Sequence, residues 1–148
     1  MTGHQRLEHS ESVIKAWAGE QLTIALRLGY THLVSGMAIG FDIIAAEVAL
    51  DLGFKVWGAI PFRNQVLAYN DHWIERYMAV YDRCSGWKIT GGVEKSPGCY
   101  QQRNRWIVDR SSRLIAYYNG HPRGGTHHTV TYAQSQGRVI AYFPYGKD

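Results

Sequence analysis

Two kinds of segment follow one another along the chain. Apolar residues recur every three or four positions in the first kind, which predicts helices over residues 10–30, 40–53, 64–84, 99–112 and 124–137. The second kind consists of short apolar runs that end in glycine or proline, which predict strands over residues 31–36, 54–62, 86–92, 113–120 and 138–146. Residues 93–98, "VEKSPG", predict a loop.

This alternation predicts the fold class. Strands separated by helices imply right-handed crossovers and a mainly parallel sheet covered on both faces, which is an α/β fold. A mixed α+β fold is the alternative. The sequence contains no internal repeat or linker, so we expect a single domain over residues 1–148.

Three of the expected turns are rich in glycine: "TGHQ" at residues 2–5, "SGMAIGFD" at 35–42 and "NGHPRGGT" at 119–126. Turns that follow parallel strands meet at one edge of the sheet, where ligands bind. Glycine lets a ligand approach the free N–H groups of a helix start, which favour anions such as phosphate. Thr126 could cap its helix or donate its hydroxyl to a phosphate. A plain turn and cap is the simpler interpretation, and glycines at 36 and 40 do not match the dinucleotide fingerprint.

Composition narrows the class of protein. Of the 148 residues, 45% are hydrophobic and 19% are charged, which is typical of a globular protein, and a net charge of +4 permits an anionic ligand without requiring one. No apolar run approaches the length of a membrane span, and residues 1–11 do not form a signal peptide. Cys84 and Cys99 lack metal-ligand spacing. We expect a cytoplasmic protein without a metal, a cofactor or a membrane partner.

Two polar clusters allow alternative interpretations. Four arginines surround Trp106, at positions 103, 105, 110 and 113, and could bind nucleic acid beside a stacking ring. A solvated helix face is the more common outcome, and Asp109 offsets part of the charge. The neighbours His127 and His128 point about 100° apart on a helix and cannot chelate one metal ion.

Several of these blocks, in this order, resemble a known family: "TGHQ", "SGMAIGFDIIAAE", "IPF" with Gln65, "RNRWIVDRSSRLIAYYNG" and "GGTHHTVTYA". The chain is similar to the YpsA-like family of the SLOG superfamily. That superfamily includes the "lonely guy" phosphoribohydrolases, the single-stranded-DNA-handling DNA-processing protein A and ligand-sensing domains of bacterial NAD-linked defence systems. The resemblance implies a Rossmann-like three-layer sandwich and a ligand site formed by Gly3, His4, Ser35, Gly36, Gly40, Asp42, Arg103, Asn104, Gly124, Gly125 and Thr126. Asp109 also matches the "RN…D" block.

The chain departs from that family in three places. Only Met1 precedes Thr2, so the first strand of the sheet is expected to be short or missing. Gln5 replaces the arginine of the family's "TGHR" motif, with Arg6 one position later. The segment after "GGT" is His-His-Thr, without the glutamate that does chemistry in the phosphoribohydrolases.

These features favour binding of a nucleotide or nucleotide-derived ligand, for example of ADP-ribose type, over turnover. One alternative is an N-glycosidic hydrolase of a nucleoside monophosphate with Asp42 or Glu47 as its catalytic carboxylate. Another is a DNA-processing module that uses the arginines of residues 103–113. The modest net charge makes tight nucleic-acid binding unexpected, and the sequence leaves homo-oligomerisation open.

Overall fold

The structure is a computed structural model that describes residues 1–146. Its six strands are β1 (Thr2–Gly3), β2 (His32–Ser35), β3 (Lys55–Ile60), β4 (Gly86–Ile89), β5 (Arg113–Tyr117) and β6 (Val139–Tyr142). Its α-helices are α1 (Glu11–Arg27), α2 (Phe41–Asp51), α3 (Asp71–Arg83), α4 (Cys99–Asp109) and α5 (Gly125–Ser135), and a 3₁₀ helix, η1, spans Gln65–Ala68.

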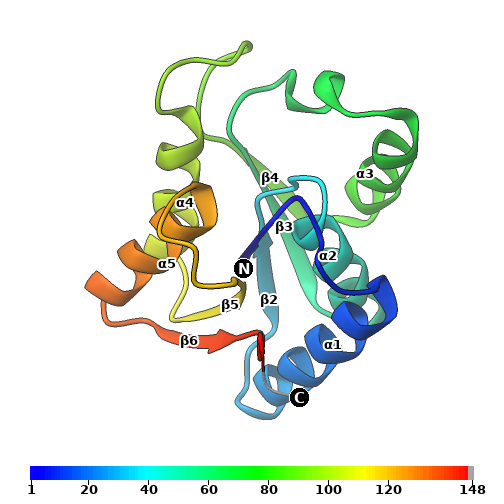
Figure 1. Ribbon diagram of the computed structural model, residues 1–148. Coiled ribbons are helices and arrows are strands. Elements are labelled where there is room, and N and C mark those ends of the chain that lie inside the picture. The colour runs from blue at the N-terminus through cyan, green and yellow to red at the C-terminus, as the bar shows by residue number, and fades with distance from the viewer. Residues whose placement is uncertain (147–148) are drawn as a thin grey trace.

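All strand pairings in residues 1–146 are parallel, in two groups with the orders β1-β5-β6 and β2-β3-β4. The groups meet at the N-terminus, where the Met1 ammonium donates to the carbonyl oxygen of Val34 at 3.2 Å. Helices α1, α2 and α3 lie on one side of the strands, and α4 and α5 lie on the other (Figure 1). The predicted three-layer α/β fold with a short first strand is therefore confirmed.

The prediction of a single long helix over residues 64–84 is wrong. The segment begins with the 3₁₀ turn η1, and α3 starts only after Asn70. The Asn70 side chain accepts a hydrogen bond from the Trp73 N–H at 3.1 Å, and such a cap stabilises a new helix start. Ser10 caps α1 in the same way, by accepting from the Val13 N–H.

Close backbone contact fixes the first turn against α2. The Phe41 ring stacks on Tyr117 at the centre of the core, and both side chains are fully buried. A Cβ atom built on Gly3 would lie 2.5 Å from Phe41, which is too close for any side chain. Gly3 therefore lets β1 lie directly on the first residue of α2.

The stability of the chain should depend on pH through its amino terminus. Burial lowers the pKa of the Met1 ammonium from 8.0 to about 6, although Asp42 opposes this. Between pH 6 and 8 the unfolded chain binds more protons, so the free energy of unfolding should rise with pH by at most about 1.4 kcal/mol per unit. Urea denaturation at pH 6, 7 and 8 measures this slope.

An N-terminally acetylated chain is the control for that measurement, because it keeps every other titrating group. His4 contributes in the same direction, since burial lowers its pKa from 6.5, and acetylation leaves that contribution intact. The acetylated chain should show a shallower slope, and equal slopes in both chains would contradict the assignment to Met1.

Candidate ligand-binding site

A pocket of about 430 Å³ lies at the carboxyl end of β1, where the glycine turns meet. The first turns of α2 and α5 both reach it, which confirms that the two predicted turns lie at the same edge of the sheet. Helix α4 forms the remaining wall. The lining residues are Thr2, Gly3, His4, Gln5, Ala38, Asp42, Tyr100, Gln101, Arg103, Asn104, Gly125 and Thr126.

The start of α5 leaves its first N–H groups unpaired within the helix. Gly124 is the N-cap residue, with a φ of 91°, and no side chain of the described residues caps the helix. Because Thr126 follows the first helical residue, the capping role suggested for it is wrong. The His128 N–H is the first to bond back, to the Gly124 carbonyl oxygen at 3.1 Å. A Cβ atom at Gly125 would meet only Asn104 Nδ2, at 3.9 Å, so the space beside it is open.

Hydrogen bonds and close contacts fix the turn between β2 and α2. Ser35 Oγ donates to the Asp42 carbonyl oxygen at 3.1 Å and accepts from the Met37 N–H at 3.1 Å. A Cβ atom at Gly40 would lie 2.5 Å from the Gln5 carbonyl oxygen. At Gly36 it would lie 2.6 Å from Arg103 Nη1. Ser35, Gly36 and Gly40 therefore shape the pocket wall without lining it.

Two opposite charges form the floor of the pocket. Arg103 is 4% exposed and donates to the carbonyl oxygens of Gly36 and, at 3.2 Å, Ala59. Asp42 is 7% exposed, and its Oδ1 has no hydrogen-bond partner within residues 1–146. Burial raises the pKa of the Asp42 carboxyl, which Arg103 and the Met1 ammonium partly offset. The floor thus holds a carboxyl group with spare hydrogen-bonding capacity.

His4 contributes polarity but no charge at neutral pH. Its Nε2 lies 3.0 Å from Asn119 Oδ1, which fixes the ring at the pocket rim. Burial lowers the pKa of His4 from 6.5, so its imidazole is neutral at pH 7. An anion in the pocket would therefore be held by backbone N–H groups and not by an imidazolium.

The sequence profile of the family described as YpsA, YspA SLOG family, matches residues 4–143. This chain belongs to the YspA SLOG family. The SLOG chain is 23% identical over 128 residues to a UPF0398 protein of Bacillus pumilus (strain SAFR-032), covering 82% of this chain and 69% of that protein.

Solved structures share the fold of the SLOG chain. It aligns over 97% of its length with DNA processing protein A of Streptococcus pneumoniae (TM-score 0.67, 21% identity). It aligns equally well with DNA processing protein A of Helicobacter pylori, described for its single-stranded DNA binding mode (TM-score 0.67, 19% identity). A third is TM1055 (TM-score 0.61, 16% identity, 94% of this chain). The chain spans 48%, 63% and 69% of these structures, respectively.

Glu47 of the SLOG chain lies outside the pocket. Its carboxylate accepts hydrogen bonds from Arg76 at 2.6 and 2.8 Å, and Arg76 also binds Glu11. This network ties α1, α2 and α3 together on one side of the sheet. Of the two candidate catalytic carboxylates, only Asp42 reaches the pocket.

The four arginines near Trp106 do not form one face. Arg103 points inward, whereas Arg105 and Arg110 are exposed. The Arg110 guanidinium stacks on the Trp106 ring at 4.2 Å. A nucleic-acid-binding face built from these four arginines would therefore lack Arg103.

Part of the pocket wall was not predicted from the sequence. Tyr100 and Gln101 line the pocket from α4, Thr2 lines it from β1, and Gln5 and Ala38 line it from the turns. The spacing of Tyr100, Arg103 and Asn104 places them on one helix face, and this pattern could have identified Tyr100. In the described part of the chain no cluster of metal-ligating side chains occurs, and no helix is both long and apolar enough to span a membrane.

Proposed function

We propose that this pocket binds a nucleotide or a nucleotide-derived ligand, with a phosphate against the first turn of α5. The observation that carries the proposal is the uncapped start of α5, which opens into the pocket beside the bare Cα of Gly125. Free N–H groups and the helix dipole favour an anion at that position.

The rest of the pocket suits the remainder of such a ligand. A volume of about 430 Å³ lies within the range of small-molecule sites. Tyr100 offers a ring to a base, and the amides of Gln101 and Asn104 offer hydrogen bonds to a ribose or a base edge. A phosphorylated nucleoside, for example an ADP-ribose-type molecule, combines these chemical groups.

Asp42 supports a second candidate function, hydrolysis of an N-glycosidic bond. A carboxylate beside a bound sugar can stabilise the oxocarbenium-like transition state of that reaction. Asp42 lines the pocket, and its Oδ1 has no hydrogen-bond partner among residues 1–146. The segment after Gly125 carries Thr126, His127 and His128 and no carboxylate, which favours binding without turnover.

DNA processing is a third candidate because two similar structures are DNA processing proteins. With Arg103 buried, the exposed arginines of α4 and its end are Arg105 and Arg110. Two arginines can make only a few contacts with phosphates, and such binding is weak and salt-sensitive. We therefore do not expect tight binding of single-stranded DNA at physiological salt.

One set of measurements separates these functions. Thermal shift with AMP, ADP-ribose, inorganic phosphate and a dT oligonucleotide should show stabilisation by a nucleotide, because a ligand of the native state raises Tm. Chromatography of AMP incubated with the wild type should show no free base. Base release that Asp42→Asn abolishes would identify a hydrolase. Sub-micromolar oligonucleotide binding lost in Arg105→Ala with Arg110→Ala would identify a DNA-binding module.

A further inference from the structure

One face of the strands β2, β3 and β4 is only half covered. Helix α4 packs on the end of β3, where Arg103 donates to the Ala59 carbonyl oxygen and the Ala59 side chain is fully buried. Two residues earlier on the same face of β3, Trp57 is 38% exposed. Parallel sheets are normally covered on both faces, so a further element can pack on this open half.

The two strand tryptophans show which face is open. Trp87 of β4 stacks on Tyr81 of α3, with 4.0 Å between the ring centres, so Trp87 faces α3. A Cβ atom at Gly86 would lie 2.5 Å from the Trp57 ring, so this ring lies across Gly86. Because Gly86 precedes Trp87 on the strand, the two residues face opposite sides. The open half therefore lies on the side of α4, opposite α3 (Figure 1).

A groove of about 710 Å³ runs between α4 and β4 on this side. We call it the α4–β4 groove; the lining residues used below are Lys88 of β4 and Arg105, Trp106 and Asp109 of α4. Strands β2 to β4 span two strand spacings, about 9–10 Å, which is close to the width of one helix. The element that fits the open half is therefore a helix that lies beside α4.

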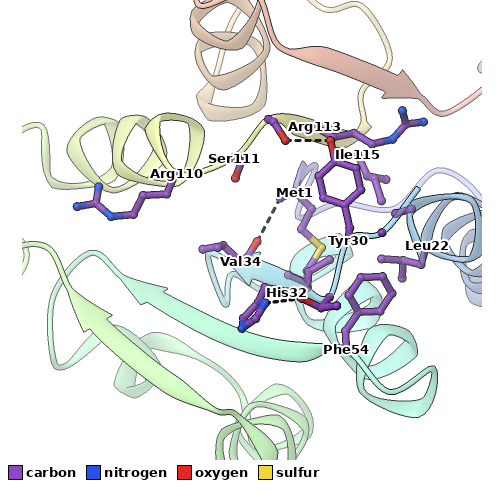
Figure 2. Close-up of a pocket in the computed structure, with 15 residues that line it drawn as sticks. Met1, Leu22, Tyr30, His32, Val34, Phe54, Arg110, Ser111, Arg113 and Ile115 are labelled. Atoms are coloured by element: carbon purple, nitrogen blue, oxygen red, sulfur yellow. Dashed lines mark hydrogen bonds between the residues drawn. The ribbon is translucent and has the colours of Figure 1, made fainter. Parts of the chain in front are cut away.

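Positive charge surrounds the groove. Lys88 and Arg105 line it, and Lys55 is exposed on the same face of the sheet. Arg110, at the end of α4 (Figure 2), stacks on the Trp106 ring at 4.2 Å. Within residues 1–146, none of these four basic side chains forms an ion pair. The groove therefore suits a negatively charged helix.

The groove supplies little negative charge of its own. Asp109 is the one acidic side chain that lines it in the described part of the chain. Its carboxylate accepts a hydrogen bond from Tyr132 Oη at 2.8 Å, on the α5 side of the helix. The four basic side chains thus remain available to an acidic occupant.

The outer face of α3 has the complementary character. Asp71, Glu75, Met78 and Asp82 recur at helical spacing, and all four are exposed. The opposite face of α3, which includes Tyr77, is buried against the rest of the chain. None of the three carboxylates forms an ion pair with another group of residues 1–146. Helix α3 thus presents negative charge around one exposed apolar side chain.

One chain cannot bring these two surfaces together. Helix α3 lies on one side of β3 and β4, and the α4–β4 groove lies on the other side (Figure 1). A second copy of the chain can supply the missing helix. Because the two surfaces differ, such a contact is heterologous, and each copy keeps one free helix or one free groove for the next copy.

We propose that α3 of one copy docks in the α4–β4 groove of the next, so that the chains associate head to tail in an open array. Lys88 and Arg105 meet the carboxylates of Glu75 and Asp82, and Met78 packs toward the exposed Trp57 ring. Each α3 then covers its own sheet on one face and the neighbouring sheet on the other. This surface lies apart from the nucleotide pocket, and the proposal does not depend on the function of that pocket.

Sedimentation velocity of the intact chain tests this assembly. At about 20 mM NaCl, where charges are weakly screened, the weight-average sedimentation coefficient should rise continuously with concentration and pass the value of a dimer. At about 500 mM NaCl the chain should sediment as a monomer, because screening weakens contacts between exposed charges. A monomer at millimolar concentration in low salt, or a rise that stops at a dimer, would overturn the proposal.

Two matched double variants identify the surfaces. Lys88→Met with Arg105→Met disables the groove and keeps α3, whereas Glu75→Gln with Asp82→Asn disables α3 and keeps the groove. All four side chains are exposed, so both variants should keep the wild-type Tm, and each alone should sediment as a monomer in low salt.

An equimolar mixture of the two variants should form a 1:1 dimer and nothing larger. The intact helix of the groove variant fills the intact groove of the helix variant, and the two surfaces that remain free are both disabled. Self-association of either variant, or a mixture that stays monomeric while the wild type assembles, would show that α3 does not dock in the groove.

Discussion

An Arg103→Met variant is expected to lose about 2–4 kcal/mol of the free energy of unfolding. The Arg103 guanidinium is buried and donates to the carbonyl oxygens of Gly36 and Ala59. Methionine fills the space of the aliphatic stem but leaves both carbonyl groups without these donors. It also removes a positive charge that offsets the buried Asp42. Urea denaturation at pH 7 measures the loss.

Arg105→Met is the matched control, two residues along the same helix. Arg105 is exposed, and its guanidinium lies 5.5 Å from the centre of the Tyr132 ring, so its loss should cost less than about 1 kcal/mol. Adding Asp42→Asn to Arg103→Met should recover part of the stability, because the uncompensated carboxyl is then absent. Similar losses in the two arginine variants would contradict the role assigned to Arg103.

The layered fold and the edge that holds the candidate site could be predicted because both follow from local patterns. Apolar spacing marks helices and strands, and Ser10 marks the start of α1. Once the strands are parallel, their carboxyl ends share one edge, so the turns before Asp42 and Gly125 had to converge. Asn70 carried a comparable start signal for α3, which the apolar spacing of the surrounding residues concealed.

The roles of the charged residues could not be predicted, because distant contacts decide them. Arg103 stands in a run of arginines that resembles a solvated face, yet its partners Gly36 and Ala59 are 67 and 44 residues away. Glu47 lies one helical turn beyond Ile43, but Arg76 of α3 binds its carboxylate outside the pocket. Which partner each charged side chain binds depends on which buried groups need a partner after the helices pack.

The short first strand was visible in the sequence, but its consequence was not. Strand β1 spans only Thr2–Gly3, as expected. Its short length does not indicate whether β2 and β5 pair with each other. In the structure they do not pair, and the Met1 ammonium donates to the Val34 carbonyl oxygen where the two groups of strands meet.

A Gly125→Val variant is expected to bind AMP or ADP-ribose at least tenfold more weakly than the wild type, which is about 1.4 kcal/mol or more. Gly125 is the first residue of α5 and lines the pocket. A valine side chain there would occupy the open space over the first N–H groups of the helix, where the proposal places the phosphate. Isothermal titration of wild type and variant with the nucleotide that gives the largest thermal shift measures the change.

Gly124→Ala separates loss of binding from loss of folding, because the two glycines differ in backbone conformation. Gly124 has a φ of 91°, which strains any other residue by roughly 1–2 kcal/mol, whereas Gly125 has an ordinary φ that valine can adopt. A Cβ atom at Gly124 meets no atom within 4 Å, and Gly124 does not line the pocket. Gly124→Ala should therefore lower Tm and keep nucleotide affinity. Gly125→Val should keep Tm and lower nucleotide affinity. Wild-type affinity in a folded Gly125→Val chain would place the phosphate elsewhere than the start of α5.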